Sequence, residues 1–311
     1  MKDKKLLLNL LALITVVIWA TTFISSKILL NTFTPLEVMF YRFVIAYFLL
    51  LIIHPKFHKI DSLKEEAMFL LSGITGGSLY FLAENSAVKI SQVSNVGLIV
   101  ATAPIITALL AHFFTKGEKL NKNLFIGFLI AISGVFLVMF NGNFMLKLNP
   151  AGDILALCAA LSWSIYSITT KKFGSKYNYL YLTRKIFFYA LLTMIPFLFT
   201  SEFNFDISKL LTFNVISNLL FLGIVASSLC YVVWNFTVDK LGVVKTNNYI
   251  YLIPAITLIL SVLVLHEKIT LFSSMGALLI FLGVYVSENG LKFNIVSNAT
   301  NSTQEETLSD I

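Results

Sequence analysis

Apolar residues fall in long blocks along the chain, separated by short polar segments that are rich in lysine. Each block holds about 18 to 25 residues, the length that an α-helix needs to cross about 30 Å of hydrocarbon. A helix satisfies its own backbone hydrogen bonds, so each block can span a lipid bilayer. We therefore predict an all-α integral membrane protein with ten transmembrane helices, at residues 6–30, 36–54, 67–88, 94–115, 122–140, 152–172, 178–200, 212–237, 244–265 and 270–288.

Composition agrees with a membrane protein and leaves little chain for a soluble domain. Of the 311 residues, 57% are hydrophobic and only 13% are charged, whereas a soluble domain carries about 25% charged residues. The first block follows Lys2, Lys4 and Lys5, as a signal peptide would. It is too long for one and lacks a small-residue cleavage site, so we interpret it as a retained helix.

Lysines alternate between the two sides of the predicted membrane. With a cytoplasmic N-terminus, the inner segments hold 15 lysines and the outer segments hold 4. This asymmetry follows the positive-inside rule and places both termini, including the polar tail 289–311, in the cytoplasm of a cell whose cytoplasmic membrane the chain crosses. It also accounts for the net charge of +7, so we expect the lipid bilayer, and no nucleic acid, as a partner.

The two halves of the chain share a sequence pattern. Trp19 and Lys27 recur as Trp163 and Lys171, each 144 residues later. Recurrences at a fixed offset of 150 residues are Gly73, Asn85 and Pro104, which return as Gly223, Asn235 and Pro254. Glu118, Gly127 and Gly134 return 149 residues later as Glu267, Gly276 and Gly283. The pattern predicts two repeats, at residues 6–140 and 152–288, each of five helices.

Five helices per repeat is an odd number, so the second repeat must enter the membrane from the opposite side. The lysines agree, because the loop 31–35 has none whereas its counterpart after the sixth block carries Lys171, Lys172 and Lys176. Inverted repeats allow one arrangement to open to either side of the membrane, which is typical of secondary transporters. The alternative is a duplicated membrane protein with a scaffolding or enzymatic role.

Two stretches of the sequence, one in each half, resemble the pattern of a known family. Ala103-Pro104-Ile105 with Gly117-Glu118-Lys119-Leu120, and Ile253-Pro254-Ala255 with His266-Glu267-Lys268-Ile269, are similar to the pattern of the ten-helix EamA-type transporters of the drug/metabolite transporter superfamily. The resemblance covers about residues 10 to 288. It implies transport without ATP hydrolysis, often export of amino acids or other small metabolites, through a cavity lined by helices 1, 3, 4, 6, 8 and 9.

Candidate substrate-binding residues are the aromatic and polar side chains within those helices. Trp normally gathers at the membrane interface, yet Trp19 and Trp163 lie halfway along their blocks. Each indole either lines the cavity or anchors helix packing. Further candidates on these helices are Thr22, Tyr80, Glu84, Tyr166, Tyr231, Trp234, Asn235, Asn248 and Tyr251.

Prolines and glycines recur at matched positions. Pro104 and Pro254 each free a backbone carbonyl inside a helix, so we expect a hinge or a cavity-facing backbone there, although proline kinks also occur for structural reasons alone. The glycines at 73, 76, 77 and 223, and those of the fifth and tenth helices at 127, 134, 276 and 283, we expect to allow close helix packing.

Glu84 is an acidic residue that the predicted boundaries place inside the block 67–88. An ionisable group in a membrane usually faces the bundle interior or a wet cavity. Substrate contact or coupling to a proton is one hypothesis, and a structural hydrogen bond or an interfacial position is the other. Lys27, Arg42, Arg184 and Lys185 lie near block ends, where we expect them to snorkel to the headgroups.

An enzyme or a sensor is the competing function. His54, His58, His112 and His266 match no catalytic motif, and no Cys/His spacing resembles a metal site. The chain also lacks the G-x-x-x-x-G-K-[ST] loop that binds ATP phosphates. We therefore expect no enzyme activity and no cofactor. The substrate and the coupling ion stay open at this point.

Overall fold

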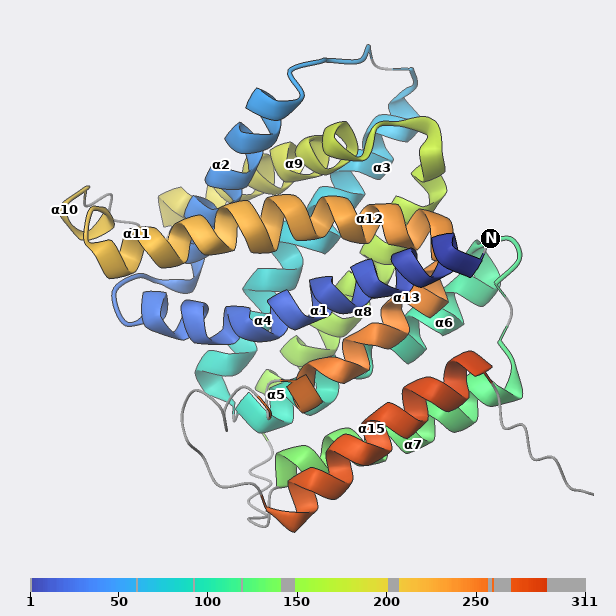
Figure 1. The fold of residues 1–311 in the computed structure, drawn as a ribbon. Coiled ribbons are helices and arrows are strands. Elements are labelled where there is room, and N and C mark those ends of the chain that lie inside the picture. Colours follow the sequence, from blue (N-terminus) through green and yellow to red (C-terminus); the bar gives the residue numbers. More distant parts are fainter. Residues whose placement is uncertain are drawn as a thin grey trace, which may run out of the picture.

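The computed structural model describes residues 2–59, 61–91, 93–118, 120–140, 149–200, 207–256, 259 and 270–289 (Figure 1). Their secondary structure is helical, and no strand occurs in these ranges. Elements of the first half are α1 (Lys2–Leu30), α2 (Pro35–Ile53), α3 (Leu63–Gly73), η1 (Ile74–Ser78), α4 (Leu79–Ile90), α5 (Val93–Val100), α6 (Ala103–Phe114) and α7 (Lys122–Phe140).

Elements of the second half are α8 (Pro150–Phe173), η2 (Gly174–Lys176), α9 (Tyr179–Thr200), α10 (Ile207–Leu210), α11 (Phe213–Leu220), η3 (Phe221–Leu229), α12 (Cys230–Leu241), α13 (Val243–Asn248), η4 (Tyr249–Tyr251) and α15 (Leu271–Asn289). The tail beyond residue 289, residues 260–269 and residues 141–148 lie outside the described part of the chain.

Several helices are long and apolar enough to cross a membrane. In the described residues there are six, namely Lys4–Thr22, Pro35–Ile53, Leu63–Ala87, Pro150–Lys176, Tyr179–Phe199 and Phe213–Leu241. Shorter apolar helices lie at Ala103–Phe114, Lys122–Val138 and Leu271–Ser287. Large hydrophobic side chains such as Phe113 and Phe213 are 76% and 82% exposed, as lipid-facing residues would be. The chain is thus a multi-pass membrane protein.

The fourth predicted helix is broken in two. Helix α5 ends at Val100, and α6 begins at Ala103 with Pro104 in its first turn. The Thr102 hydroxyl donates to the carbonyl of Ile99 at 2.6 Å, which holds the break. A proline in the first turn loses no intrahelical hydrogen bond, because the N–H groups there have no partner within the helix. Pro104 therefore starts a helix here rather than interrupting one.

Two helices of the bundle contain a wider π-helical stretch at corresponding places. The first, η1, joins α3 to α4, and the second, η3, joins α11 to α12. The Ser228 hydroxyl donates to the carbonyl of Gly223, five residues earlier, at 2.8 Å. Stretches of π-helix are rare and often occur at functional sites. Both stretches therefore favour a functional site in the middle of the bundle.

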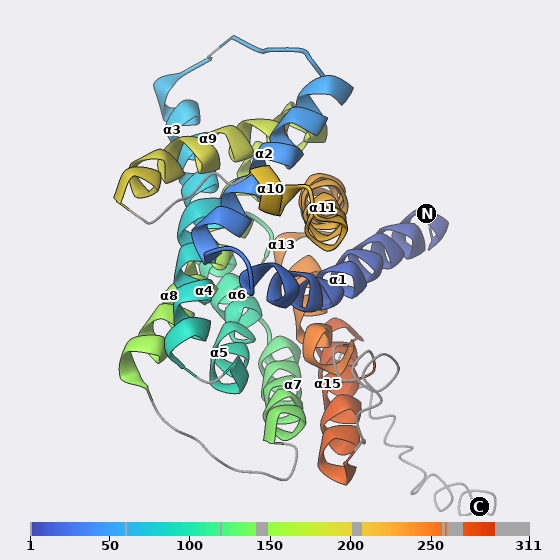
Figure 2. The ribbon, with the colours of Figure 1, turned by 90° about the vertical axis from the view of Figure 1, so that its left-hand side faces the viewer.

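Helices α7 and α15 lie side by side at one edge of the molecule, and α2, α3 and α9 pack together at the opposite edge (Figure 2). Glycines bring α7 and α15 into backbone contact. A Cβ atom added at Gly134 would lie 2.5 Å from the carbonyl oxygen of Gly276, and one at Gly127 would lie 2.6 Å from that of Gly283. The two helices therefore run in opposite directions, and the glycines serve packing.

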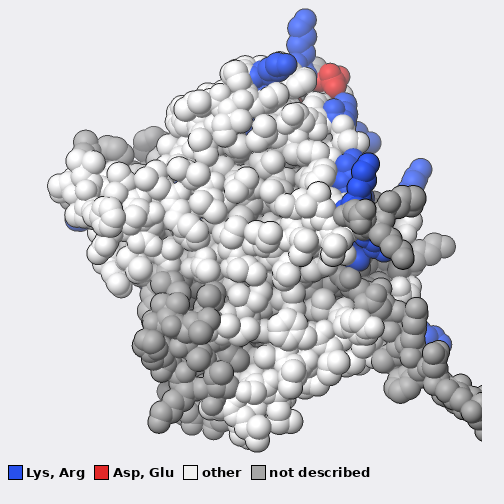
Figure 3. Space-filling model, in the orientation of Figure 1, with Lys and Arg blue, Asp and Glu red and all other residues white. Residues whose placement is uncertain are grey.

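Charged side chains avoid the broad face over α1 and α12 (Figure 3). On that face most lysines and arginines gather at one edge, towards the N-terminus of α1. The middle of the face is uncharged. Such a surface suits a bilayer whose headgroups and water meet the charges at one end of the helices.

Candidate functional site

Three tryptophans from three helices meet in the middle of the bundle. Trp19 of α1 lies 5.4 Å from Trp163 of α8 and 4.8 Å from Trp234 of α12, measured between ring centroids. Trp163 and Trp234 are buried, and Trp19 is half-buried. The Trp19 indole donates to the carbonyl of Ala226 at 3.0 Å, and the Trp163 indole donates to Oδ1 of Asn247 at 2.9 Å. Both polar groups thus bond within the protein.

Tyrosines and an asparagine extend this cluster. The Tyr231 hydroxyl donates to the carbonyl of Gly76 at 3.0 Å, and the Tyr166 hydroxyl donates to Oδ1 of Asn235 at 2.8 Å. Asn235 in turn donates to the hydroxyl of Thr183 at 3.1 Å. Gly76 has no room for a side chain, since an added Cβ would lie 2.2 Å from the Tyr166 ring. We call Trp19, Trp163, Tyr166, Tyr231, Trp234 and Asn235 the central cluster.

Charged residues lie beside the central cluster. The Tyr80 ring is 5.5 Å from that of Trp163, and its hydroxyl donates to Oε1 of Glu84 at 2.9 Å. Arg42 of α2 donates from Nε to the hydroxyl of Ser227 in η3 at 2.9 Å. Arg42 is only 6% exposed, so the expectation that it snorkels to the headgroups is wrong. Its depth of seven residues inside α2 is a sequence signal for a buried position.

The other cations bond to the loop between α2 and α3 or to α3 itself. Arg184 donates to the carbonyl oxygens of His54 and of Lys56, the latter at 2.7 Å. Lys185 forms an ion pair with Glu66 at 2.6 Å. The side chain of Lys27 lies outside the described residues. These two cations therefore hold α9 against the first half of the chain.

Some candidate residues lie apart from the central cluster. The Thr22 hydroxyl donates to the carbonyl of Trp19 on its own helix at 2.7 Å. Asn248 donates to Ser287 of α15 at 2.6 Å, and the Tyr251 ring lies 6.4 Å from that of Phe128 in α7. Pro254 follows the turn η4 and is half-buried. Asn248 and Tyr251 thus face the α7 and α15 pair.

Asn247, rather than Asn248, reaches the central cluster. It is fully buried, accepts from the Trp163 indole and from the Ser167 hydroxyl at 3.3 Å, and donates to the carbonyl of Val243 at 2.9 Å. Neighbouring residues of a helix point in directions about 100° apart. The sequence pattern alone does not say which asparagine faces inward.

Glu118 joins the two halves of the chain at the start of α13. Its two carboxylate oxygens accept from the backbone N–H groups of Val243 and Val244 at 2.7 and 2.8 Å. Gly242 precedes them at φ +100°, a conformation that favours glycine. A carboxylate at a helix N-terminus satisfies free N–H groups and complements the helix dipole. A pocket of about 230 Å³ adjoins this contact.

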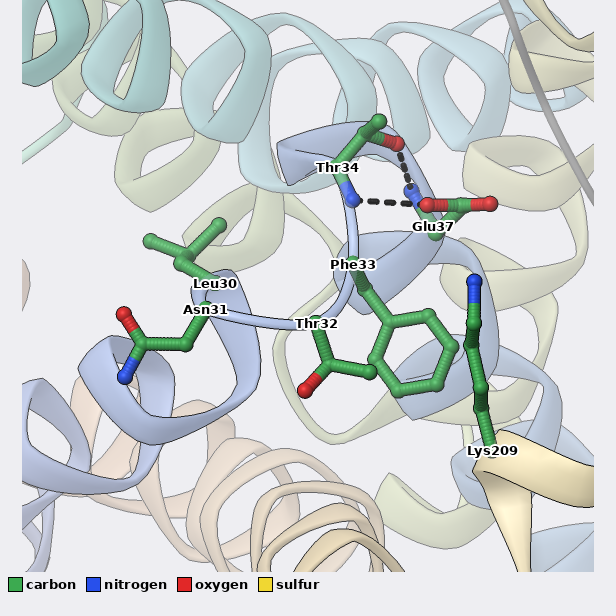
Figure 4. Close-up of a pocket in the computed structure, with 7 residues that line it drawn as sticks. All are labelled: Leu30, Asn31, Thr32, Phe33, Thr34, Glu37 and Lys209. Atoms are coloured by element: carbon green, nitrogen blue, oxygen red, sulfur yellow. Dashed lines mark hydrogen bonds between the residues drawn. The ribbon is translucent and has the colours of Figure 1, made fainter.

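A second pocket, of about 280 Å³, lies at the loop between α1 and α2 (Figure 4). Thr34 and Glu37 bond reciprocally there: the Thr34 N–H donates to Glu37 Oε2 at 2.6 Å, and the Glu37 N–H donates to Thr34 Oγ1 at 3.3 Å. This is a capping box, which starts helix α2. None of the residues that line this pocket belongs to the central cluster.

In this protein, apolar helical spans surround a buried cluster of aromatic and polar side chains. It is therefore a multi-pass membrane protein with a polar core. The EamA-like transporter family matches the chain over residues 6–140 and 150–288. The chain therefore belongs to the EamA-like transporter family.

Relatives match over nearly their whole lengths. An "Uncharacterized transporter" of Archaeoglobus fulgidus is 28% identical over 285 residues, covering 90% of this chain and 96% of that protein. A "Probable amino-acid metabolite efflux pump" of Escherichia coli is 27% identical over 296 residues, covering 92% and 96%. A solved crystal structure matches with a TM-score of 0.75 at 16% identity, covering 91% of this chain and 98% of that chain, which shows the shared fold.

Proposed function

We propose that this protein is a secondary transporter that exports small metabolites, amino acids among them, across the cytoplasmic membrane by alternating access. Two five-helix repeats, at residues 6–140 and 152–288, exchange their roles as the central site opens first to one side and then to the other. The central cluster, with Glu84 and Tyr80, contacts the substrate. Breaks near Pro104 and Pro254 supply hinge or cavity-facing backbone.

Reciprocal contacts between the halves carry this proposal. An added Cβ at Gly73 would meet Tyr189 and Ile186 of α9, and one at Gly223 would meet Ile45 and Arg42 of α2. The same offset of 144 residues relates Arg42 to Ile186 and Ile45 to Tyr189, while 150 residues relate Gly73 to Gly223. One contact thus occurs twice with the halves exchanged. Such exchange supports a pseudo-two-fold axis, which inverted-repeat transporters use.

Relatives support the substrate class. The name of the Escherichia coli relative states amino-acid metabolite efflux, and at 27% identity over most of both chains the two proteins share a family and a fold. Hydrogen-bonding groups next to aromatic rings suit a small molecule with polar and apolar parts. A multi-span enzyme or sensor remains the alternative function, and transport by the purified protein decides between them.

Transport is tested with purified protein in liposomes. Counterflow of each radiolabelled amino acid, with and without a pH gradient, should exceed that of protein-free liposomes for at least one of them. Glu84→Gln keeps the shape and removes the charge. If a proton is coupled at Glu84, this variant loses the dependence on the pH gradient, whereas an unchanged rate and pH profile contradicts the coupling.

Topology is tested by labelling single cysteines in intact cells. Ser175 in η2 is exposed and has negative φ, so Ser175→Cys, made together with Cys158→Ser, is a mild change. Asn31→Cys is its counterpart between α1 and α2. An impermeant maleimide should label position 31 and leave position 175 unlabelled. Labelling of position 175 would contradict the inverted repeats and the cytoplasmic termini.

A further inference from the structure

Arg42 and Glu84 are opposite charges beside the central cluster that do not form an ion pair. Within the residues that the structure describes, no ion pair of 4.0 Å or less joins them. Arg42 nevertheless approaches the helix that carries Glu84, since its guanidinium carbon lies 4.6 Å from the centre of the Phe81 ring of α4, three residues before Glu84. A buried charge is costly unless it is paired, so each of these two groups would be stabilised by a ligand that carries the opposite charge.

Neutral hydrogen bonds hold both charged groups in place. Arg42 uses Nε on Ser227 of η3, and its guanidinium carbon lies 4.6 Å from the centre of the Phe81 ring. The two terminal nitrogens of the guanidinium are its remaining donors. Glu84 accepts from Tyr80 at Oε1, and Oε2 is its remaining acceptor. Each group therefore keeps hydrogen-bonding capacity in a fixed orientation.

The unused groups match the two charged ends of a zwitterion. A guanidinium binds a carboxylate through paired N–H groups. A carboxylate next to aromatic rings binds an ammonium group, because the ring faces also attract a cation. Tyr80 supplies such a ring beside Glu84, and the Trp163 ring lies 5.5 Å from that of Tyr80. Both charges are needed, since Arg42 alone would accept any carboxylate and Glu84 alone would accept any amine.

The second half of the chain has no equivalent charges. Residues 144 or 150 positions later are Ile186 for Arg42 and Trp234 for Glu84, and Ser227 corresponds to Gly77. The charged subsite is thus confined to α2 and the α3–η1–α4 helix, with Ser227 contributed from η3. Trp163, which lies 5.5 Å from Tyr80, connects this subsite to Tyr231 and Trp234, whose rings lie 6.1 and 6.0 Å from its own.

We propose that Arg42 and Glu84 are specificity-determining residues that select zwitterionic amino acids, with the substrate carboxylate on Arg42 and the ammonium group on Glu84. This proposal rests on the transport function proposed above. Arg42 thus binds the substrate instead of reaching the lipid headgroups. It also excludes, as good substrates, amines without a carboxylate and acids without an amine.

The test compares matched competitors of amino-acid counterflow in liposomes. For the radiolabelled amino acid with the highest counterflow, the competitors are that amino acid, its decarboxylated amine and its deaminated acid. For leucine these are 3-methylbutylamine and 4-methylpentanoate. In wild-type protein both analogues should compete about tenfold to a hundredfold more weakly than the amino acid, the range expected for one hydrogen-bonded charge.

The variants should change this preference in opposite ways. In Arg42→Gln the amine should compete as well as the amino acid, while the acid stays weak. In Glu84→Gln the acid should compete as well as the amino acid, while the amine stays weak. Arg42→Lys retains the positive charge and should restore part of the preference for the amino acid over the amine. A purely structural role would lower all three affinities together.

Lys116→Gln is the control, because it removes an exposed cation between α6 and α7 and leaves Arg42 and Glu84 in place. It should keep the wild-type order of competitors. The same preference in wild type, Arg42→Gln and Glu84→Gln would overturn the proposal, as would loss of the order in Lys116→Gln. Transport of other solutes but of no amino acid would overturn it and leave the transport function standing. Folded protein that transports nothing would contradict the proposed function itself.

Discussion

Helices α7 and α15 contact each other through glycine backbones, whereas α1, α8 and α12 meet through the large side chains of the central cluster. At the glycine contact, carbonyl oxygens lie where a Cβ would be, so any added atom must push the helices apart. In the central cluster, the contacts between helices are hydrogen bonds made by the indoles and hydroxyls of long side chains, and the backbones stay further apart. The first region suits stability, and the second suits binding.

Among the variants that test this comparison, Gly134→Leu should have the largest effect, on the yield of folded protein. An added Cβ at Gly134 would lie 2.5 Å from the Gly276 carbonyl oxygen and 2.7 Å from the Ile280 nitrogen, so a leucine there forces the two backbones apart. We expect loss of most folded protein, measured as the monodisperse fraction after detergent extraction. Leu129→Ala, on the exposed face of the same helix, is the control. Normal yield of Gly134→Leu would show that the contact is dispensable.

Trp163→Phe and Trp19→Phe should reduce transport while leaving the amount of folded protein near wild type. Each removes an indole N–H that bonds Asn247 or Ala226. Losing a buried hydrogen bond costs about 1–3 kcal/mol, which is about fivefold to 150-fold in rate if the bond acts in the transport cycle.

Gly127→Ala sharpens the same comparison. An added Cβ there would lie 2.6 Å from the Gly283 carbonyl oxygen, so this variant should melt at a lower temperature while each folded molecule transports at the wild-type rate. Counterflow per folded molecule, with melting curves, checks both predictions. Wild-type transport by the Trp variants would leave the indoles with a packing role only.

Glu118→Gln should have a smaller effect, at the contact between the halves. The amide keeps one acceptor oxygen, so one of the N–H groups of Val243 and Val244 loses its partner, and the negative charge at the start of α13 disappears. Loss of a helix cap costs about 1 kcal/mol, which corresponds to a few degrees in melting temperature. Lys116→Gln, two residues earlier and exposed, should melt like wild type, and equal melting of both variants would refute the cap.

Asp61→Asn should have the smallest effect, because Asp61 lies in the exposed loop between α2 and α3. The hydrogen bond and ion pair with Lys176 at 2.9 Å hold the pKa of Asp61 below its ordinary value of 3.8. A lowered folded-state pKa means that any stabilisation is present above about pH 4 and is lost as the pH falls further. Melting curves of wild type and variant should therefore converge as the pH falls below the folded-state pKa of Asp61, and a difference that grows in acid would contradict the ion pair.

Much of the fold could be predicted from the sequence, because in a lipid bilayer the local sequence of a segment decides whether it forms a transmembrane helix. The length of an apolar block and its lysine flanks identify a span without reference to any other span. The prediction of an all-helical membrane protein and of the EamA-type family is confirmed. The break at residues 101–102 was not predicted, because Pro104 fits a continuous pattern of hydrophobic residues as well as a helix start.

Some of the candidate site residues could likewise be predicted from the sequence, and others could not. Trp19, Trp163, Tyr166, Tyr231, Trp234 and Asn235 could be named from residue type and from the helices that the resemblance assigns to the cavity, and the structure brings them together. Their roles in transport stay predictions. The burial of Arg42 was missed although its depth inside α2 favours it, and its hydrogen-bond partner Ser227, a residue 185 positions away, could not be predicted from the local pattern.

The sequence by itself determined that this chain crosses a membrane in apolar helices and belongs to the EamA-like transporter family, since spans and sequence motifs are properties of single segments and of their order. Only the tertiary structure decided which polar groups face one another. Asn247 rather than Asn248 bonds Trp163, and Glu118 bonds the start of α13. The physical reason is that a hydrogen bond depends on distances of about 3 Å, which the packing of helices from both halves sets and no local pattern contains.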